Sequence, residues 1–574
     1  MVSVRRQRWL VVPAILLFYF LALNSLVGDS PTMDEQNHIA RGFAYLRTGD
    51  PRLSVEHPPL VNSFSAMPLL TMPEIGLPLD DPSWDRLPAD VFWYVFAEKF
   101  IWQINRSLDI QLIYFLARLP IVYLTIGLAL VGWHFAREMW GHPTSLLVFL
   151  LLLFDPNILA NGRYSTTDIG GALFALLATY LLWRLWQKQD WNWRRWLWAA
   201  LGIGLAFSSK LSTLVFAFIW AVLALLPLYG EGKNRSFRAA FRRLIQLILA
   251  GFAALLILWV IYRLEWGHFL FLSERFTGLN SLQGPMPTFW SGIERIMLLT
   301  GGGRPGFLLG QFSNQGFPLY FPVILLTKTP LLTLVMFLAA AIILVVLRQT
   351  RRNGIFLLVA AAVFFTISLF SALNLGYRHL LPVLPFMYLL IGGLASKPVR
   401  EWAWHYFVSP SDDQEGESKA PVVSVILLLL SLILIDIWIH PHYLSYFNLI
   451  AGGPANGHHI AIDSNIDWGQ DLLRLQGWME DNEVDRVNLA WFGTADPDYY
   501  GLNYDPLPGF PRPAFISQWT DPPFNPTEPG PGIYAISASS LWELPLGEKN
   551  VYPWFREREP DDRIGYSILI FEVP

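Results

Sequence analysis

Long apolar runs alternate with short polar segments over most of this 574-residue chain. A helix needs roughly 20 apolar residues to cross the hydrocarbon core of a bilayer. The first such run, residues 9–27, follows Arg5, Arg6 and Arg8. A secretory signal peptide has a similar basic start, but no small-residue cleavage site follows, so we predict a retained span. Ten further runs are candidate spans: residues 111–136, 144–160, 169–187, 195–209, 211–229, 243–263, 318–347, 355–374, 379–396 and 421–439.

The basic residues between these eleven runs predict an orientation. Lys and Arg concentrate in the cytoplasmic loops of membrane proteins. If the N-terminus is cytoplasmic, the basic loops at 188–195, 230–243 and 348–354 all lie inside, as does the polar segment 397–420. An odd number of crossings then places residues 440–574 outside. We therefore predict an α-helical polytopic protein of the plasma membrane, with a cytoplasmic N-terminus and an extracytoplasmic C-terminal region.

Three long segments lie outside the membrane in this topology. Residues 28–110 and 264–317 form outer loops rich in proline, and an aromatic stretch at 91–104 suggests a helix lying on the membrane. The tail contains three β-like runs and one helix, at residues 487–492, 532–537, 566–573 and 470–479 respectively. We predict two domains, a transmembrane domain of residues 1–439 and a small extracytoplasmic α/β domain of residues 440–574.

The composition agrees with this pattern and excludes several functions. Only 15% of the residues are charged and 53% are hydrophobic, whereas soluble chains carry about a quarter charged residues. The absence of cysteine excludes disulfides, cysteine-based zinc sites and thiol nucleophiles. The net charge of −4 gives no basic excess, so we expect membrane lipids and no nucleic acid among the partners.

Ionisable residues gather at the predicted outer ends of the spans, where charge is costly and usually functional. Asp34 and Glu35 follow the first span, and Glu56 and His57 begin a Glu-His-Pro-Pro run. Further members are Arg118, Asp155, Arg163, Asp168, Lys210, Arg378 and His379. Each alone is compatible with a charged helix anchor. Because they come from at least five segments at one predicted depth, we predict that they form one site.

The residue types in this set indicate chemistry on a lipid phosphate. A carboxylate can act as a general base toward a hydroxyl, and Lys and Arg can hold a phosphate. Carboxylates also offer a site for a divalent cation, which we keep as a possible cofactor. A transporter or lipid flippase is the alternative, although transporters tend to place ionisable groups near the midplane and to contain inverted repeats. A third interpretation is a surface anchor whose tail binds a partner.

Several short motifs resemble those of a known family. Met33-Asp34-Glu35 and then Glu56-His57-Pro58-Pro59-Leu60 resemble the first outer loop of GT-C class membrane glycosyltransferases. The branch includes the dolichyl-phosphate-mannose–protein mannosyltransferases and the bacterial aminoarabinose transferase acting on lipid A. Matching motifs follow in order: Gly162-Arg163-Tyr164 with Thr167-Asp168, Leu205 to Lys210, Tyr320-Phe321-Pro322 with Lys328-Thr329-Pro330, Gly376-Tyr377-Arg378-His379, and the acidic run Asp463 to Asp471.

This resemblance implies transfer of a hexosyl or pentosyl group from a polyprenyl-phosphate-linked donor, outside the cytoplasm, to a lipid, glycan or protein acceptor. By match to the family's acidic pair, Asp34 is the catalytic base. We also predict Glu35 as a catalytic residue, which orients the loop or binds a cation. The implied roles of the others are catalytic support by Asp168, donor-phosphate binding by Lys210, Arg378, His57 and Arg163, and metal binding by Glu56. His57 stands where the aminoarabinose branch has lysine. For the run Asp463–Asp471 we favour an Asx-rich turn over a cap on the site.

Overall fold

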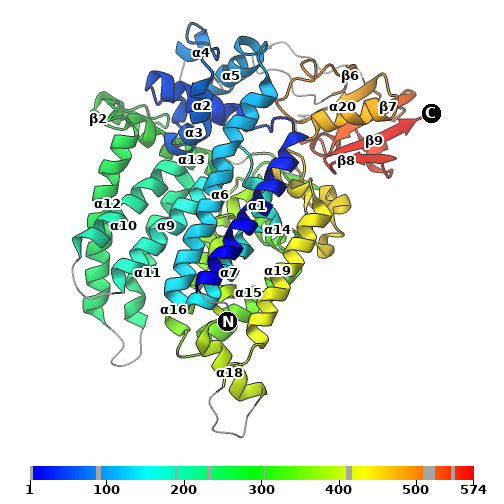
Figure 1. Ribbon diagram of the computed structural model, residues 1–574. Helices are drawn as coiled ribbons and strands as arrows, with labels where there is room; N and C mark the ends of the chain where they lie inside the picture. Colours follow the sequence, from blue (N-terminus) through cyan, green and yellow to red (C-terminus); the bar gives the residue numbers. More distant parts are fainter. Residues whose placement is uncertain are drawn as a thin grey trace.

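The computed structural model of the protein describes residues 4–85, 92–187, 192–229, 236–302, 304–408, 416–508, 524–525, 527–544 and 550–574. Long helices lie side by side, the smaller outer elements gather at one end of them, and the C-terminal sheet lies at that same end (Figure 1). The start of the chain and helix α18 (Lys397–Phe407) lie at the opposite end. The basic residues Lys188, Lys233 and Arg235, used above for the orientation, lie outside the described residues.

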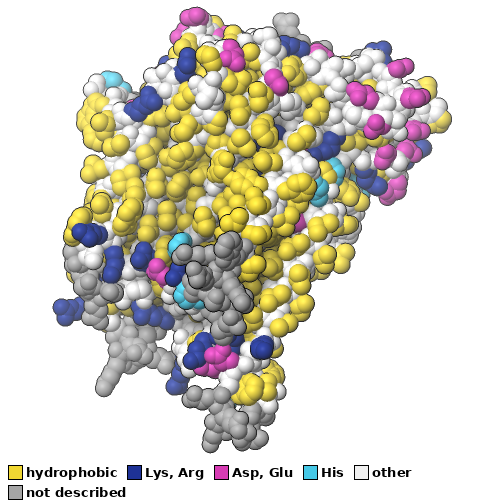
Figure 2. Space-filling model, in the orientation of Figure 1, with side chains coloured by type: hydrophobic (Ala, Val, Ile, Leu, Met, Phe, Trp, Pro, Cys, Tyr) yellow, Lys and Arg dark blue, Asp and Glu magenta, His cyan; other side chains and the backbone are white. Residues whose placement is uncertain are grey.

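Seven helices in the described part of the chain are long and apolar enough to cross a membrane. They confirm a helical, multi-pass membrane protein. Their bounds are Val4–Val27 (α1), Ile110–Trp140 (α6), Asp168–Trp186 (α9), Leu211–Tyr229 (which includes α11, Val215–Leu225), Phe237–Ile261 (α12), Arg351–Ser368 (α16) and Ala420–Ile439 (α19). Their outward side chains include large exposed apolar residues such as Leu256 and Leu434, and yellow side chains cover the helices in Figure 2.

The predicted count of eleven spans is not confirmed, because the other four runs are short or bent helices. Three of them form α7 (His142–Leu153), α10 (Trp193–Ser209) and α17 (Leu384–Gly393). The fourth consists of α14 (Tyr320–Lys328) and α15 (Leu331–Val346), which meet at 110°. Pro330 explains this break, since the residue before a proline disfavours the helical region and Thr329 is extended. Counted as one span, the pair gives eight.

The two predicted outer loops contain regular structure. Residues 28–110 include α2 (Glu35–Thr48), α3 (Pro59–Ala66), α4 (Pro82–Asp85) and α5 (Phe92–Lys99). The second loop includes two hairpins, β1 (Trp266–His268) with β2 (Gln283–Pro285) and β3 (Gly306–Leu308) with β4 (Gln311–Ser313), and helix α13 (Pro287–Gly302). Helix α5 belongs to the predicted aromatic stretch, of which Val91 lies outside the described residues. The stretch packs against α2, with Phe96 and Phe100 fully buried.

The tail contains the predicted small α/β unit. Its sheet has the order β6-β5-β7-β9-β8, in which the pairs β6–β5 and β5–β7 are parallel and the pairs with β9 are antiparallel. The bounds are Val487–Ala490 (β5), Tyr504–Pro506 (β6), Gly532–Ser537 (β7), Asp562–Ile564 (β8) and Ile568–Val573 (β9). Helix α20 (Leu472–Asp481) precedes the sheet, and the short helices α21 (Ala538–Leu541) and α22 (Pro553–Arg556) follow β7.

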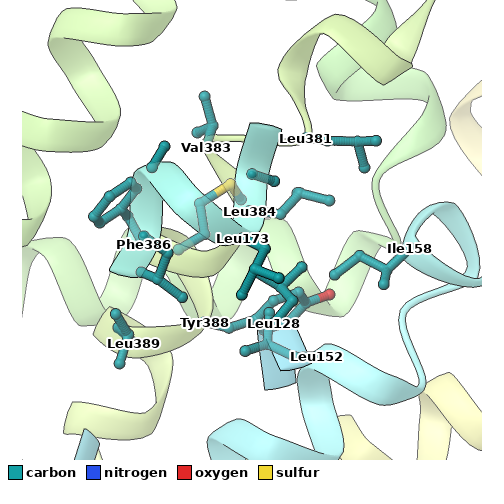
Figure 3. Packing of buried hydrophobic residues seen from close by; sticks show 14 of the residues in the cluster. Leu128, Leu152, Ile158, Leu173, Leu381, Val383, Leu384, Phe386, Tyr388 and Leu389 are labelled. Atoms are coloured by element: carbon teal, nitrogen blue, oxygen red, sulfur yellow. The ribbon is translucent and has the colours of Figure 1, made fainter. Parts of the chain in front are cut away.

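Two hydrophobic cores hold these parts together. The larger core lies among the membrane helices, where Leu384 and Leu389 of α17 are completely buried between neighbouring helices (Figure 3). The second core joins Phe43 of α2 to Leu472 of α20 and Ile570 of β9. The outer helices and the C-terminal sheet therefore form one packed layer over the membrane helices.

Candidate active site

One cavity of about 580 Å³ lies where this outer layer meets the ends of the membrane helices. Part of its wall is apolar, formed by side chains of α13, α16 and the segment after it; these include Ile293, Ile296, Met297, Phe364, Ile367 and Phe370. Another part is polar and contains Asp34, His57, Asp168, Lys210 and Arg378, all predicted above as site residues. The cavity can therefore hold a ligand with one charged and one hydrocarbon part.

Asp34 stands at the start of α2, with its side chain about one-third exposed. Its Oδ2 accepts a hydrogen bond from Arg378 Nη1 at 2.7 Å. Burial acts to raise the pKa of Asp34, but the charge and hydrogen bond of Arg378, together with His38 and Arg304, outweigh it and leave the pKa below its usual value. Asp34 is therefore ionised at neutral pH and able to accept a proton.

Arg378 and Lys210 both approach Asp168, the first residue of α9. Lys210 Nζ donates a hydrogen bond to Asp168 Oδ1, and Arg378 Nη1 lies 3.8 Å from Asp168 Oδ2. Lys210 reaches this position because its extended backbone separates α10 from the following 3-10 turn. The Arg378 guanidinium also stacks over Trp468, 4.4 Å from the ring centroid. Two cations are thus held next to the cavity by a shared carboxylate.

Two histidines form another part of the polar wall. The rings of His38 and His57 meet edge to face at 4.6 Å between centroids. His38 Nδ1 pairs with Asn62 at 2.9 Å, and His57 Nδ1 pairs with Thr167 at 3.1 Å. Burial lowers the pKa of His38 to about 4, and burial together with His38 and Arg41 lowers that of His57. Both rings are therefore neutral at pH 7 and offer hydrogen bonds instead of charge.

The surroundings of Glu56 do not fit a metal ion. Its Oε2 lies 3.3 Å from Arg41 Nη2, and its Oε1 lies 3.5 Å from Arg295 Nε, so both oxygens face guanidinium groups. Within the described ranges, His, Asp and Glu side chains form no group of three or more that could hold a metal. We therefore assign no chemical step to a metal.

Glu35 and Arg163 lie in a separate buried cluster and do not line the cavity. Arg118 donates to both Glu35 oxygens, at 2.8 and 2.7 Å, and the Ser165 N–H donates to Oε1 at 2.8 Å. Arg163 pairs with Asp29, whose other oxygen lies 2.6 Å from Arg474 Nη1 of α20. These ion pairs fasten the end of α1 to the turn before α9 and to the tail.

The remaining predicted residues also have defined places. His379 lines the cavity, whereas Asp155 caps the short helix α8 (Pro156–Asn161) by accepting two backbone N–H groups, both at 2.9 Å.

The sequence analysis missed several lining groups, among them His38, Arg41, Arg304 and Trp468, and favoured a turn over a cap on the site for the run that starts at Asp463. The acidic run from Asp463 to Asp471 does form a 3-10 turn at its start, from Asp463 to Asn465. It also places Asp463 and Trp468 in the cavity wall. The acidic run in the sequence could have predicted that Asp463 and Trp468 line the site. For His38, the only indication in the sequence was its position four residues after Asp34.

Comparisons with known proteins agree with the resemblance drawn from the motifs. Residues 101–263 match the family model described as dolichyl-phosphate-mannose-protein mannosyltransferase. The matched family is one that the motifs of this chain resemble. No curated protein matches the chain.

Solved structures also resemble this one at low identity. ArnT from Cupriavidus metallidurans in the apo state is 12% identical, with a TM-score of 0.49, 98% of this chain covered and 97% of that chain. The same protein bound to undecaprenyl phosphate is 13% identical, with a TM-score of 0.47 and the same coverage. The archaeal oligosaccharyltransferase AglB from Archaeoglobus fulgidus, in complex with an inhibitory peptide and a dolichol-phosphate, is 13% identical, with a TM-score of 0.43, 83% of this chain covered and 58% of that chain.

Proposed function

We propose that this protein is a glycosyltransferase of the plasma membrane that moves a sugar from a polyprenyl-phosphate-linked donor to an acceptor hydroxyl on the outer face. The observation that carries the proposal is the cavity, which joins an apolar wall to Asp34, Lys210 and Arg378. A prenyl chain suits the apolar wall, and a phosphate suits the two cations. The family match over residues 101–263 supports the same class of reaction and favours it over a transporter or flippase.

Asp34 acts as the general base in this reaction. It takes the proton of the acceptor hydroxyl while the acceptor oxygen forms a bond to the anomeric carbon of the sugar. The bond between that carbon and the phosphate oxygen breaks, and its electron pair leaves with the polyprenyl phosphate. Lys210 and Arg378 stabilise the charge that develops on this phosphate, while Asp168 holds the two cations in place.

Donor binding also adjusts the strength of the base. Arg378 keeps the pKa of Asp34 below its usual value, despite burial, while the two groups are paired. A donor phosphate that draws the Arg378 guanidinium away removes this effect, so the pKa of Asp34 rises. Asp34 therefore becomes a stronger base when the donor is in place.

The proposal covers several donors and acceptors. Hexosyl and pentosyl groups both fall within it, as do lipid, glycan and protein acceptors. In the proposed orientation the N-terminus is cytoplasmic, and the cavity opens at the extracytoplasmic ends of the helices, beneath the C-terminal sheet.

A transfer assay tests the proposal. Purified protein is incubated with a panel of radiolabelled polyprenyl-phosphate hexoses and pentoses and with membrane lipid and glycan extracts. We expect Asp34→Asn to lower transfer by at least about a hundredfold, because a general base typically contributes 10² or more. The matched control is Asp50→Asn, which removes a partly exposed carboxylate of the same outer segment that pairs with Arg52. Transfer by Asp34→Asn at the wild-type rate would disprove the assignment.

A further inference from the structure

The C-terminal region contributes part of the cavity wall. Asp463 and Trp468 both line the cavity, and the Trp468 ring supports the Arg378 guanidinium at 4.4 Å. Asp463 adopts a left-handed backbone conformation with φ +58°. Its N–H donates to Ser539 Oγ at 3.0 Å, and one oxygen of its carboxyl group accepts the Ser464 N–H. The segment that starts at Asp463 is thus fixed next to the predicted catalytic groups.

Two motifs without a role in the proposed chemistry hold this segment. Asn465 Nδ2 donates to the Tyr320 hydroxyl at 2.9 Å, and Asn465 Oδ1 accepts the Tyr377 N–H at 3.0 Å. The buried ammonium of Lys328 donates to the backbone oxygens of Leu444, at 2.9 Å, and of Asn465. Through Asn465, these contacts connect the Tyr-Phe-Pro and Lys-Thr-Pro motifs to Tyr377, the residue next to Arg378.

Gly376 permits the closest approach between the two segments. A Cβ atom at this position would lie 2.3 Å from Ser464 Oγ, whose hydroxyl donates to the Leu375 carbonyl at 2.7 Å. A larger residue would displace the Ser464 hydroxyl from the Leu375 carbonyl. The contacts of these motifs therefore help to hold the tail segment in the cavity wall.

The charges around the cavity show what Asp463 can do there. Glu56 and Arg41 pair with each other. The other lining carboxylates, Asp34, Asp168 and Asp463, face three lining cations, Lys210, Arg304 and Arg378. A donor phosphodiester adds one negative charge to this balanced set. The Nε of Arg378 is buried and has no hydrogen-bond partner among the described residues, so this guanidinium still has an unused donor.

We propose that Asp463 binds the donor phosphate in its protonated form, donating a hydrogen bond to a phosphate oxygen beside Arg378. This inference rests on the proposed function and extends it, since it makes the C-terminal region part of the donor site. The proton stays on Asp463, and no bond to it forms or breaks during the transfer. A neutral carboxyl group removes the excess negative charge that the donor introduces.

The electrostatic surroundings of Asp463 support a protonated carboxyl group. Its pKa is raised to about 7, chiefly by burial and also by the nearby Asp34, although Arg378 and Arg304 act in the opposite direction. Tyr320 of α14 and Asp467 of the same segment also face it. Negative phosphate in the cavity acts in the same direction as Asp34, so the bound donor favours the protonated form.

Two substitutions at this position test the inference. Asparagine imitates the protonated carboxyl group, glycine removes the side chain, and both residues tolerate positive φ. We expect the KM for the wild-type donor to rise between about pH 6 and pH 8, as Asp463 loses its proton. Asp463→Asn should keep the low KM throughout this range. Asp463→Gly should have a KM about tenfold above the low-pH wild-type value at every pH, as for a lost hydrogen bond to a charged group.

A neighbouring carboxyl group, that of Asp467, provides the control. Asp467→Asn removes a neighbouring carboxyl group whose pKa burial also raises to about 7 but which does not line the cavity, so it should keep the wild-type pH dependence. An Asp463→Asn variant as impaired as Asp463→Gly would overturn the inference, as would unchanged KM in Asp463→Gly. If wild-type protein transfers no sugar, the proposed function fails. Equilibrium binding of a radiolabelled polyprenyl-phosphate hexose over the same pH range then tests this inference, with the Kd of each variant compared in place of its KM.

Discussion

At the scale of single residues, Arg378 connects the parts of the site. Its Nη1 lies 2.7 Å from Asp34 and 3.8 Å from Asp168, and Trp468 supports the plane of its guanidinium. A planar fork can serve two carboxylates and a phosphate from one position, whereas a lysine ammonium is a compact point charge. The identity of this cation therefore matters as well as its charge.

We predict that Arg378→Lys lowers kcat/KM for the donor roughly ten- to hundredfold, because it loses charge-assisted hydrogen bonds of about 1.5–3 kcal/mol each. The measurement is a series of initial transfer rates at increasing donor concentration. Arg351→Lys is the control, since Arg351 bonds to the Val345 carbonyl at 2.9 Å and does not line the cavity. Equal activity of the two variants would show that the shape of the Arg378 side chain has no role.

The sequence predicted which residue types gather at the site better than it predicted which way they point. Asp34 and Glu35 are neighbours, yet Asp34 lines the cavity and Glu35 is buried against Arg118. Neighbouring residues at a helix start point in different directions, and only the packing of α2 decides which direction is the cavity. The ion pair of Arg163 with Asp29 could not be predicted either, because the two residues lie far apart in the sequence.

At the scale of elements, the long apolar helices were predictable because the length of a membrane span is a strong constraint. The break between α14 and α15 was not predicted, although Pro330 explains it. Strands β7 and β9 coincide with predicted runs, whereas β6 and β8 have three residues each, too few to show an alternating pattern. Short elements like these depend on their neighbours in the sheet for their conformation.

Asn465 offers a test of how the tail segment is held by these elements. We predict that Asn465→Ala lowers the free energy of unfolding by about 1–3 kcal/mol, because the Tyr377 N–H loses its buried partner. The KM for the donor should rise as well, since Asp463 and Trp468 lose their support. Thermal unfolding in lipid nanodiscs and donor titrations measure the two effects.

The control for this variant is Asn482→Ala, which removes an exposed amide that caps the end of α20 through the Trp478 carbonyl. It should leave both quantities close to wild type. A loss of stability in Asn465→Ala with unchanged KM would mean that the segment supports the fold and leaves the donor site unaffected.

At the scale of the whole molecule, the tail and the outer helices share a hydrophobic core. The first residues of the tail, including Tyr443 and Phe447, belong instead to the core of the membrane helices. Alternation of apolar residues predicted a sheet in the tail but carried no information about what the sheet packs against. The buried ion pair of Asp29 with Arg474 shows the same connection, because its two residues lie at opposite ends of the sequence.

This arrangement makes the predicted orientation testable with single thiols. Helix α18 and the end of α20 lie at opposite ends of the molecule (Figure 1), and the chain contains no cysteine, so each Cys variant carries one thiol. Lys397 of α18 is 67% exposed, and Asp481 of α20 is also exposed. In right-side-out membrane vesicles, a membrane-impermeant maleimide should label Asp481→Cys directly and Lys397→Cys only after permeabilisation. The basic residues near α18 favour this result, because Lys and Arg concentrate on the cytoplasmic side. The reverse labelling pattern would place the cavity in the cytoplasm and contradict transfer on the outer face.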